Sequence, residues 1–369
     1  MRVLISGGGT GGHVNPAVAI ANYLREKNKN IQIAFAGTEK GLENKVVPRE
    51  GYKLYYLKVL PFNRKKKISF ANAAAAVKAV TSRAAAKKII KDFRPDIVVG
   101  TGGYVSWPVL SVAAKLKIPA VIHEQNAFPG LTTKMLAKTA DKVMISFEES
   151  RKYFKNQDNL IYTGNPVRRE YFETDGKQAK KELSPGRTMI LSVGGSGGAE
   201  GLNDTAIDFM DKYAKNKNIT HYHVTGARSY KTYSKQFKDR GLGVYNNLFL
   251  SEYIYDIYKY YAAADIIICR AGALTLTELA VLKKPAVLIP SPYVAENHQY
   301  KNAEILEKQN AAVIIEEKDL SAEKLAEIIE ALTADPFKLL DMAKNIGRFA
   351  PDGALDKIYD IITGLKNPE

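Results

Sequence analysis

Cysteine is almost absent from this sequence: Cys269 is the only one among 369 residues, so no disulfide can form within the chain. A reducing compartment is the default for such a protein, and we expect this thiol to be a small apolar filler at a strand end. No run of eighteen uncharged apolar residues occurs, and the first residues lack an apolar stretch behind a basic start. We therefore expect neither export nor a membrane span.

Aspartate pairs of the form D-x-D are also missing. Because Mg²⁺ on a diphosphate is usually held by one or two carboxylates, we expect no protein-held metal. His221 and His223 alternate on a predicted strand, but no third ligand lies near them in the sequence, and we interpret them as structural. We expect no cofactor.

Positive charge is distributed very unevenly along the chain. The net charge is +15, and residues 1–165 hold 27 Lys and Arg against 11 Asp and Glu, whereas residues 166–369 hold 27 against 28. This asymmetry predicts an anionic partner for the first half, which could be nucleic acid, a membrane surface or a phosphorylated substrate. The length suits two domains of the usual size.

A glycine-rich turn stands near the start of the chain. Ser6-Gly-Gly-Gly-Thr-Gly-Gly-His13 follows the apolar run 3–5 and precedes the apolar stretch 14–21, which predicts a strand, a turn and a helix. Three of its glycines fit G-x-G-x-x-G, in which a phosphate or sugar can approach backbone N–H groups at a helix N-terminus. His13 adds a titratable side chain at the mouth of the turn, where reacting groups would lie.

The rest of the first half predicts a parallel sheet. Short apolar segments at 31–36, 53–57, 96–100, 120–123 and 142–145 are separated by helical stretches. Three loops leave strand ends where ligands bind in such sheets: 101–108, 123–130 and 163–169, the last also resembling a hinge. The second loop begins with four polar residues that are hard to explain as core, although His123 alone could simply bond a neighbouring loop.

A basic stretch lies between the third and fourth of these strands. It holds four consecutive cations flanked by apolar side chains, a combination that suits an anionic lipid surface. A solvated surface loop is the alternative, since most charge runs are only that. The residues are Phe62, Arg64, Lys65, Lys66, Lys67, Ile68 and Phe70.

The pattern starts afresh in the second half. A strand at 189–193 runs into a glycine turn at 194–199 and a helix around 202–210, and further strands are predicted at 219–225, 248–250, 265–269, 286–289 and 312–315. The segment 270–278 predicts another strand-to-helix turn, in which Glu278 could either interact with the helix dipole or accept from two ribose hydroxyls. The polar loop 290–299 would meet Glu278 over the same sheet edge. A last helix, about 355–365, could cross back onto the first domain.

Two other classes of function fit less well. A nicotinamide-dependent oxidoreductase needs an acidic residue at the end of its second strand, but segment 31–36 ends in Gly37-Thr38 with Glu39 beyond. A nucleic-acid binder would explain the basic half but not segments 123–126 and 272–278, and no basic-aromatic RNA motif is present. We expect no nucleic-acid partner.

Two doubly wound domains that each open with a glycine turn and face a cleft are typical of the GT-B glycosyltransferases. Across its full length the chain resembles the GT-B family of bacterial transferases that move N-acetylglucosamine from UDP-N-acetylglucosamine to lipid I, undecaprenyl-pyrophosphoryl-N-acetylmuramoyl peptide, and form lipid II for peptidoglycan. Five motifs match in order: Gly8-Gly-Thr-Gly-Gly-His13, Gly102-Gly-Tyr104, His123-Glu-Gln-Asn126, Gly164-Asn-Pro-Val-Arg168, and Gly272-Ala-Leu-Thr275 with Glu278.

The resemblance implies a domain organisation and a set of donor contacts. Residues 1–164 would face acceptor and membrane, residues 165–347 would bind the UDP-sugar, and the segment 348–369 would pack back on the first domain. The phosphates, sugar, ribose and uracil would be contacted by Thr10, Gly11, Gly12, Asn126, Arg168, Ser196, Ile254, Ala273, Leu274, Thr275, Glu278, His298 and Gln299. Two positions depart from the family pattern: Gly197 replaces a usual glutamine, and Trp107 replaces a small residue.

A mechanism follows from the chemistry of the implied substrates. Direct attack by the C4 hydroxyl of the muramoyl sugar on an α-linked UDP-sugar gives a β-1,4 bond with inversion, which needs one general base and stabilisation of the departing UDP. Helix N-termini and an arginine would stabilise that charge. His13 is the candidate base, with Glu124 and Tyr104 as alternatives.

The lipid acceptor implies a peripheral position at the cytoplasmic face of the cell membrane. The basic stretch between residues 61 and 70 would supply the contact with anionic lipid. A related UDP-sugar transferase that acts on another lipid, such as diacylglycerol, is the alternative function.

Overall fold

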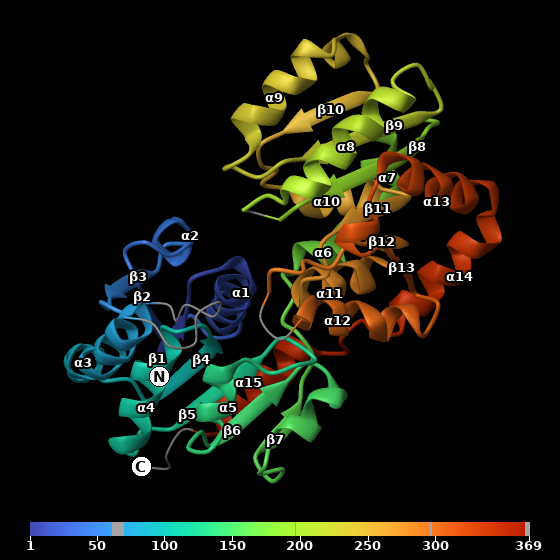
Figure 1. Ribbon diagram of the computed structural model, residues 1–369. Coiled ribbons are helices and arrows are strands. Elements are labelled where there is room, and N and C mark those ends of the chain that lie inside the picture. Colours follow the sequence, from blue (N-terminus) through green and yellow to red (C-terminus); the bar gives the residue numbers. More distant parts are fainter. Residues whose placement is uncertain (61–69, 196, 295–296, 366–369) are drawn as a thin grey trace. The chain divides into compact units, whose positions relative to one another are not determined.

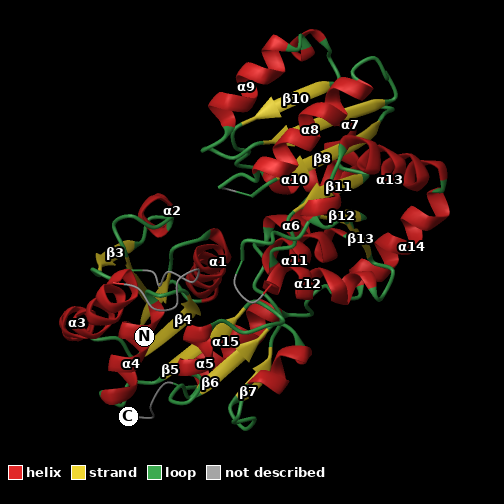
Figure 2. Cartoon of the chain, viewed as in Figure 1, coloured by secondary structure: helices red, strands yellow, loops and turns green. Residues whose placement is uncertain are grey.

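The computed structural model describes residues 1–60, 70–195, 197–294 and 297–365, and contacts between residues divide the chain into two units (Figure 1). Unit 1 comprises Met1–Val167 and Pro351–Glu369, and unit 2 comprises Arg168–Ala350. Each unit has its own parallel sheet with helices connecting the strands (Figure 2). The prediction of an α/β fold with two doubly wound domains is confirmed.

The sheet of unit 1 has seven parallel strands in the order β3-β2-β1-β4-β5-β6-β7. Its order reverses between β1 and β4, and ligands bind at such a switch point. The strands are β1 (Arg2–Gly7), β2 (Gln32–Gly37), β3 (Lys53–Tyr56), β4 (Ile97–Gly102), β5 (Ala120–Glu124), β6 (Lys142–Ile145) and β7 (Leu160–Tyr162). The helices are α1 (Gly11–Lys27), α2 (Glu43–Arg49), α3 (Phe70–Phe93), α4 (Ser106–Lys115), α5 (Leu131–Leu136), α15 (Ala354–Gly364) and a short 3-10 helix (Glu148–Tyr153).

Alternation along the strands builds a core on both faces of this sheet. Val3 and Ile5 of β1 point to the face that α1 covers, whereas Leu4 points to the face of α3 and α4. All three side chains are fully buried. Burial on both faces explains why these strands are continuous apolar runs.

The last helix, α15, packs on unit 1 although it follows unit 2 in the sequence. Ile358 and Ile362 are buried in the cluster that contains the α1-facing side chains of β1. On the exposed side, Asp356 accepts a hydrogen bond from the hydroxyl of Tyr23 and lies 3.1 Å from Nζ of Lys27. The chain therefore crosses back after Ala350 to complete the first core.

The sheet of unit 2 has six parallel strands in the order β10-β9-β8-β11-β12-β13. The strands are β8 (Thr188–Val193), β9 (Ile219–Val224), β10 (Leu248–Ser251), β11 (Ile266–Cys269), β12 (Ala286–Leu288) and β13 (Ala312–Ile314). The helices are α6 (Glu170–Glu173), α7 (Gly176–Leu183), α8 (Glu200–Tyr213), α9 (Tyr230–Asp239), α10 (Ile257–Ala263), α11 (Ala273–Leu282), α12 (His298–Glu307), α13 (Ala322–Ala334) and α14 (Pro336–Gly347), with 3-10 turns at Leu242–Val244 and Glu317–Asp319. Cys269 is buried at the end of β11.

Within the described ranges, none of the helices has the length and apolarity that crossing a membrane requires.

Two histidines of β9 are buried in the core of unit 2. Oγ of Ser192 lies 2.7 Å from both Nε2 of His221 and Nδ1 of His223, and Nε2 of His223 lies 3.1 Å from Oδ1 of Asn203. Burial lowers the pKa of His223 to about 4 and the pKa of His221 well below its usual value. The two imidazoles are therefore neutral polar groups of the core.

We expect these histidines to make the protein less stable in acid. Between pH 6.5 and 4 His223 is protonated in the unfolded chain but neutral in the folded protein. As the pH falls through this range, this residue therefore lowers the free energy of unfolding by ~1.4 kcal/mol per pH unit. Urea unfolding at several pH values should show a shallower dependence in His223→Gln than in the parent protein. Equal slopes would show that His223 is protonated in the folded state.

Candidate functional site

His13 lies on the first turn of α1, and its ring packs against the glycine pair that ends β4. A Cβ atom on Gly102 would lie 2.8 Å from Nδ1 of His13, and one on Gly103 would lie 2.4 Å from the carbonyl oxygen of Gly8. Both glycines have positive φ, 95° and 79°. Only residues without a side chain let the imidazole and the first glycine turn approach β4 so closely.

The proton on the His13 ring is fixed by its neighbours. Nδ1 lies 2.9 Å from the carbonyl oxygen of Thr101 and 3.3 Å from Oε1 of Gln125. Because a carbonyl oxygen can only accept, Nδ1 carries the proton in the neutral ring and Nε2 keeps a free lone pair. Among the described residues, nothing bonds to Nε2, and the half-buried ring keeps contact with solvent. This is the state that a general base requires.

Glu124, at the end of β5, is almost completely buried and holds the loop that follows it. One oxygen accepts from the backbone N–H and the side-chain amide of Asn126, at 3.0 and 3.1 Å, and the other accepts from the N–H of Gly130 at 3.0 Å. Its carboxylate therefore has three donors from its own loop and orients the amide of Asn126.

Tyr104 lies beside the first glycine turn. A Cβ atom on Gly9 would come within 3.1 Å of the Tyr104 ring, so the ring covers the turn closely. No described residue bonds to the Tyr104 hydroxyl. The structure thus brings His13, Tyr104 and the polar end of β5 to one edge of the unit 1 sheet.

Glu43, which the sequence analysis missed, organises the same glycine turn. Its buried carboxylate accepts from the N–H of Gly9 at 2.8 Å and from the N–H and hydroxyl of Thr38 at 2.8 and 2.7 Å. A Cβ atom on Gly8 would lie 2.6 Å from this carboxylate. The N–H of Gly9 is therefore already bonded to Glu43. The N–H groups of Gly11 and Gly12, the first two residues of α1, have no acceptor within the helix.

Glu278 lies on α11 in unit 2, among Tyr171, Arg168 and Tyr261. Its side chain keeps some contact with solvent, yet burial of the carboxyl group raises its pKa to about 7. The hydrogen bond from Tyr171 and the charge of Arg168 act in the opposite direction. Burial raises the pKa of Tyr261, and the nearby charge of Glu278 adds to this effect. A carboxylate beside one hydroxyl donor and one cation has oxygen lone pairs left to accept further hydroxyl hydrogen bonds.

Arg168 and the start of α11 form the remaining polar part of this region. The guanidinium of Arg168 lies 5.7 Å from the centre of the Tyr171 ring, and Nη1 is 4.0 Å from Glu170. Helix α11 begins after Gly272 with no side-chain cap, so the N–H groups of Ala273, Leu274 and Thr275 lack helical partners. Arg270, in contrast, is paired with Glu317 and donates to the carbonyl of Ile289.

The remaining residues predicted to contact the UDP-sugar lie in both units. Ile254 is buried after β10. His298 and Gln299 begin α12, and Oε1 of Gln299 accepts from the N–H of Ser291 at 2.9 Å. Thr10 precedes α1 and does not cap it with its side chain. Ser196 lies outside the described residues.

The membrane residues of the sequence analysis fall largely outside the described residues. Positions 61–69 are not described, and Phe70 is known only as the first residue of α3. Further along that helix, Val77 and Val80 are each 62% exposed, with the exposed Lys78 between them.

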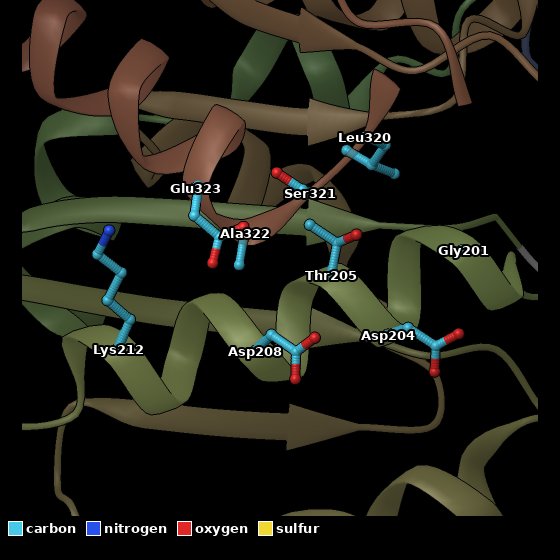
Figure 3. Close-up of a pocket in the computed structure, with 9 residues that line it drawn as sticks. All are labelled: Gly201, Asp204, Thr205, Asp208, Lys212, Leu320, Ser321, Ala322 and Glu323. Atoms are coloured by element: carbon cyan, nitrogen blue, oxygen red, sulfur yellow. The ribbon is translucent and has the colours of Figure 1, made fainter. Parts of the chain in front are cut away.

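A hollow of about 450 Å³ lies elsewhere on unit 2, between α8 and the start of α13 (Figure 3). Asp204, Asp208 and Lys212 line it from α8, and Glu323 lines it from α13. None of the predicted site residues contributes to it. Three carboxylates against one cation make it a poor site for a negatively charged sugar nucleotide.

Comparison with known proteins defines the class of this one. Residues 3–145 match the glycosyltransferase family 28 N-terminal domain, and residues 189–357 match the glycosyltransferase family 28 C-terminal domain. The two matches fall on the two sheets, each of which carries a glycine turn after its first strand. The chain belongs to glycosyltransferase family 28.

Individual members of this family are similar to the chain over nearly its full length. It is 45% identical over 367 residues to the UDP-N-acetylglucosamine–N-acetylmuramyl-(pentapeptide) pyrophosphoryl-undecaprenol N-acetylglucosamine transferase of Thermoanaerobacter sp. (strain X514), covering 99% of this chain and 100% of the relative. It is 44% identical to the enzyme of that name from Clostridioides difficile (strain 630), covering 100% and 90%. The crystal structure of Acinetobacter baumannii MurG matches with a TM-score of 0.74 and 28% identity over 98% of this chain and 99% of that one.

Proposed function

We propose that this glycosyltransferase moves N-acetylglucosamine from UDP-N-acetylglucosamine to the C4 hydroxyl of the muramoyl sugar of lipid I and so makes lipid II. The observation that carries the proposal is the full-length identity of 45% to a transferase named for these substrates. The arrangement of His13 at the carboxyl edge of the unit 1 sheet fits the chemistry, because the reaction needs one general base.

In this proposal unit 2 binds the nucleotide. Glu278 accepts from the two ribose hydroxyls, Ile254 offers its backbone to the uracil, and the free N–H groups at the start of α11 face the diphosphate. Arg168 and the donors of the second glycine turn stabilise the charge of the departing UDP. Gln299 of the same unit contacts the sugar.

In unit 1, His13 removes the proton of the attacking hydroxyl through Nε2. The contacts of the two alternatives favour this choice. The carboxylate of Glu124 already accepts three hydrogen bonds and is buried, so its role in the proposal is to orient Asn126. The ring of Tyr104 covers the first glycine turn, and no described residue bonds to its hydroxyl to activate it as a base.

The acceptor is tested by mass spectrometry. Purified protein is incubated with UDP-N-acetylglucosamine and either lipid I or diacylglycerol. We expect the mass of one N-acetylglucosamine residue to be added to lipid I and nothing to be added to diacylglycerol. Transfer to diacylglycerol alone would replace lipid I with the other lipid acceptor.

The raised pKa of Glu278 predicts that donor affinity depends on pH. If ribose binding needs the ionised carboxylate and its pKa is about 7, affinity should rise about tenfold between pH 6 and 8. UDP-N-acetylglucosamine is the ligand to use, because its diphosphate diester does not titrate in this range. Calorimetry should show this rise in the parent protein and its loss in Glu278→Gln. A parent affinity that is independent of pH would remove the ribose role from the ionised carboxylate.

We further propose that unit 1 docks reversibly on the anionic cytoplasmic surface of the membrane, where a polyprenyl-linked acceptor lies. The charge asymmetry of the chain supports this, and the exposed Val77 and Val80 of α3 share a helix face beside Lys78. Arg64 to Lys67 would each contribute about 1 kcal/mol near such a surface. Salt would weaken the interaction, which is screened over roughly 8 Å at physiological ionic strength.

Vesicle co-sedimentation tests the membrane proposal. The protein should pellet with anionic vesicles, less so at high salt, and less again when Arg64 to Lys67 are changed to Ser. A variant of unit 2 with the same charge change, Lys215, Lys217, Lys231 and Lys235 to Ser, should pellet like the parent. Should the two variants behave alike, the basic stretch is only a solvated loop.

A further inference from the structure

Two polar side chains at the end of β5 are buried deeply beside His13. His123 and Gln125 have exposed fractions of 0% and 2%. Burying polar atoms is costly unless each has a partner. Here the partners form one chain of hydrogen bonds that runs from the carbonyl of Gly164 through His123 and Gln125 to His13.

Backbone carbonyls determine which atom donates in each hydrogen bond of this series. Nε2 of His123 lies 3.0 Å from the carbonyl oxygen of Gly164, so Nε2 carries the proton and Nδ1 is an acceptor. The amide nitrogen of Gln125 lies 3.0 Å from that Nδ1 and 3.2 Å from the carbonyl oxygen of His123, and both of these can only accept. The NH₂ end of Gln125 therefore points to His123, and its Oε1 points to His13.

We infer that His123 and Gln125 are positioning residues that hold the His13 ring as its Nδ1-protonated tautomer, with Nε2 free to take a proton. Oε1 of Gln125 lies 3.3 Å from Nδ1 of His13, beside the carbonyl of Thr101 at 2.9 Å. One acceptor leaves the ring free to pivot about a single hydrogen bond, whereas two acceptors on the same N–H also orient the ring plane. The inference rests on the proposed function, in which His13 is the base.

Burial supports this function for His123 over a direct chemical one. Burial lowers the pKa of His123 to about 4, against smaller raising effects of the Gly164 carbonyl and of Glu124. The ring stays neutral at physiological pH, and both of its nitrogens are engaged. A neutral imidazole with fixed protons can orient the Gln125 amide without exchanging charge with solvent.

The test replaces Gln125 with Met, which keeps the length of the side chain and removes both polar ends. We expect kcat to fall about tenfold, as is typical when an orienting partner of a functional histidine is lost, with an unchanged KM for UDP-N-acetylglucosamine. Nitrogen-15 NMR of histidine-labelled protein reads the tautomer directly, and with five histidines in the chain the His13 signal is assigned by its loss in His13→Ala. The parent should show protonated Nδ1 on His13. Gln125→Met should show a mixture of tautomers, because a ring that pivots about the single bond to Thr101 spends part of its time away from that carbonyl.

Two further variants make the result interpretable. His123→Phe keeps a ring in the core but removes the hydrogen bond that orients the Gln125 amide. It should therefore shift the His13 tautomer in the same direction as Gln125→Met, by a smaller amount. Gln157→Met removes another glutamine of unit 1, whose amide holds the carbonyls of Arg151 and Phe154, and should leave kcat and tautomer unchanged. If Gln125→Met keeps the parent's tautomer or its kcat, the inference is wrong. If the parent itself transfers no sugar to lipid I, the proposed function fails, while the tautomer measurement still decides the inference.

Discussion

Replacing His13 with Ala should lower the turnover of lipid I by about 10²–10⁴-fold, the usual contribution of a general base. The Nδ1 proton of this ring is held by Thr101 and Gln125, and Nε2 is the atom with a free lone pair. The loss should appear in kcat measured at saturating lipid acceptor, since the ring acts on the proton of the attacking hydroxyl. The affinity for UDP should change little, because the proposed nucleotide contacts belong to unit 2.

The control for this variant is a neighbouring residue of helix α1. Asn15→Ala changes an exposed residue of the same helix and should keep parent turnover. Near-normal turnover in His13→Ala would pass the role of base to Glu124 or Tyr104. Glu124→Gln and Tyr104→Phe would then decide between them, since each removes the titratable group with little change in volume.

Replacing Glu278 with Ala should weaken UDP binding by about 10²-fold or more. Two hydroxyl hydrogen bonds to a carboxylate are worth ~1.5–3 kcal/mol each, so losing both costs ~3 kcal/mol or more. Burial next to Tyr171 and Arg168 makes this carboxylate a localised acceptor in unit 2. Titration calorimetry with UDP measures the effect, and at saturating donor kcat should fall much less.

Two matched variants separate the ribose contact from a loss of charge. Glu278→Gln keeps the volume of the side chain, and it should lose most of the affinity because an amide accepts with only one oxygen. Glu327→Ala removes an exposed carboxylate of α13 and should bind UDP like the parent. A folded Glu278→Ala variant with parent affinity would remove Glu278 from the nucleotide site.

The sequence predicts most of this fold because parallel strands buried on both faces leave a strong signal. Apolar runs alternating with helices and two glycine turns predict the strands of both sheets except β7, with ends that agree to within one or two residues. Strand β7 (Leu160–Tyr162) has only three residues, which are too few to show a pattern. The register between strands and the faces of each sheet became visible only in the structure.

The candidate site is predicted in part, and the missing part consists of contacts between distant residues. His13 and Glu278 stand in motifs and can be read from the sequence. Glu43 cannot, because its partner Gly9 is 34 residues away and nothing local marks the pair. The hydrogen bond between Tyr171 and Glu278 joins two elements of unit 2 that are much farther apart in sequence than Gly9 and Glu43.

The structure shows the surroundings of Trp107 and Gly197, the two residues that depart from the expected family pattern. The ring of Trp107 packs against the core of unit 1, and the guanidinium of Arg83 on α3 lies 5.7 Å from its centre, so the larger residue is accommodated under that helix. A Cβ atom on Gly197 would meet nothing within 4 Å. A larger side chain would fit there, and nothing in the structure explains the glycine.

The stereochemistry of the new glycosidic bond tests the central claim most directly. Purified protein is supplied with α-linked UDP-N-acetylglucosamine and lipid I, and the anomeric proton of the added sugar is examined by NMR. A single displacement with His13 as base predicts a β linkage to the C4 hydroxyl in all of the product. An α linkage, or release of free N-acetylglucosamine without transfer, would contradict the account.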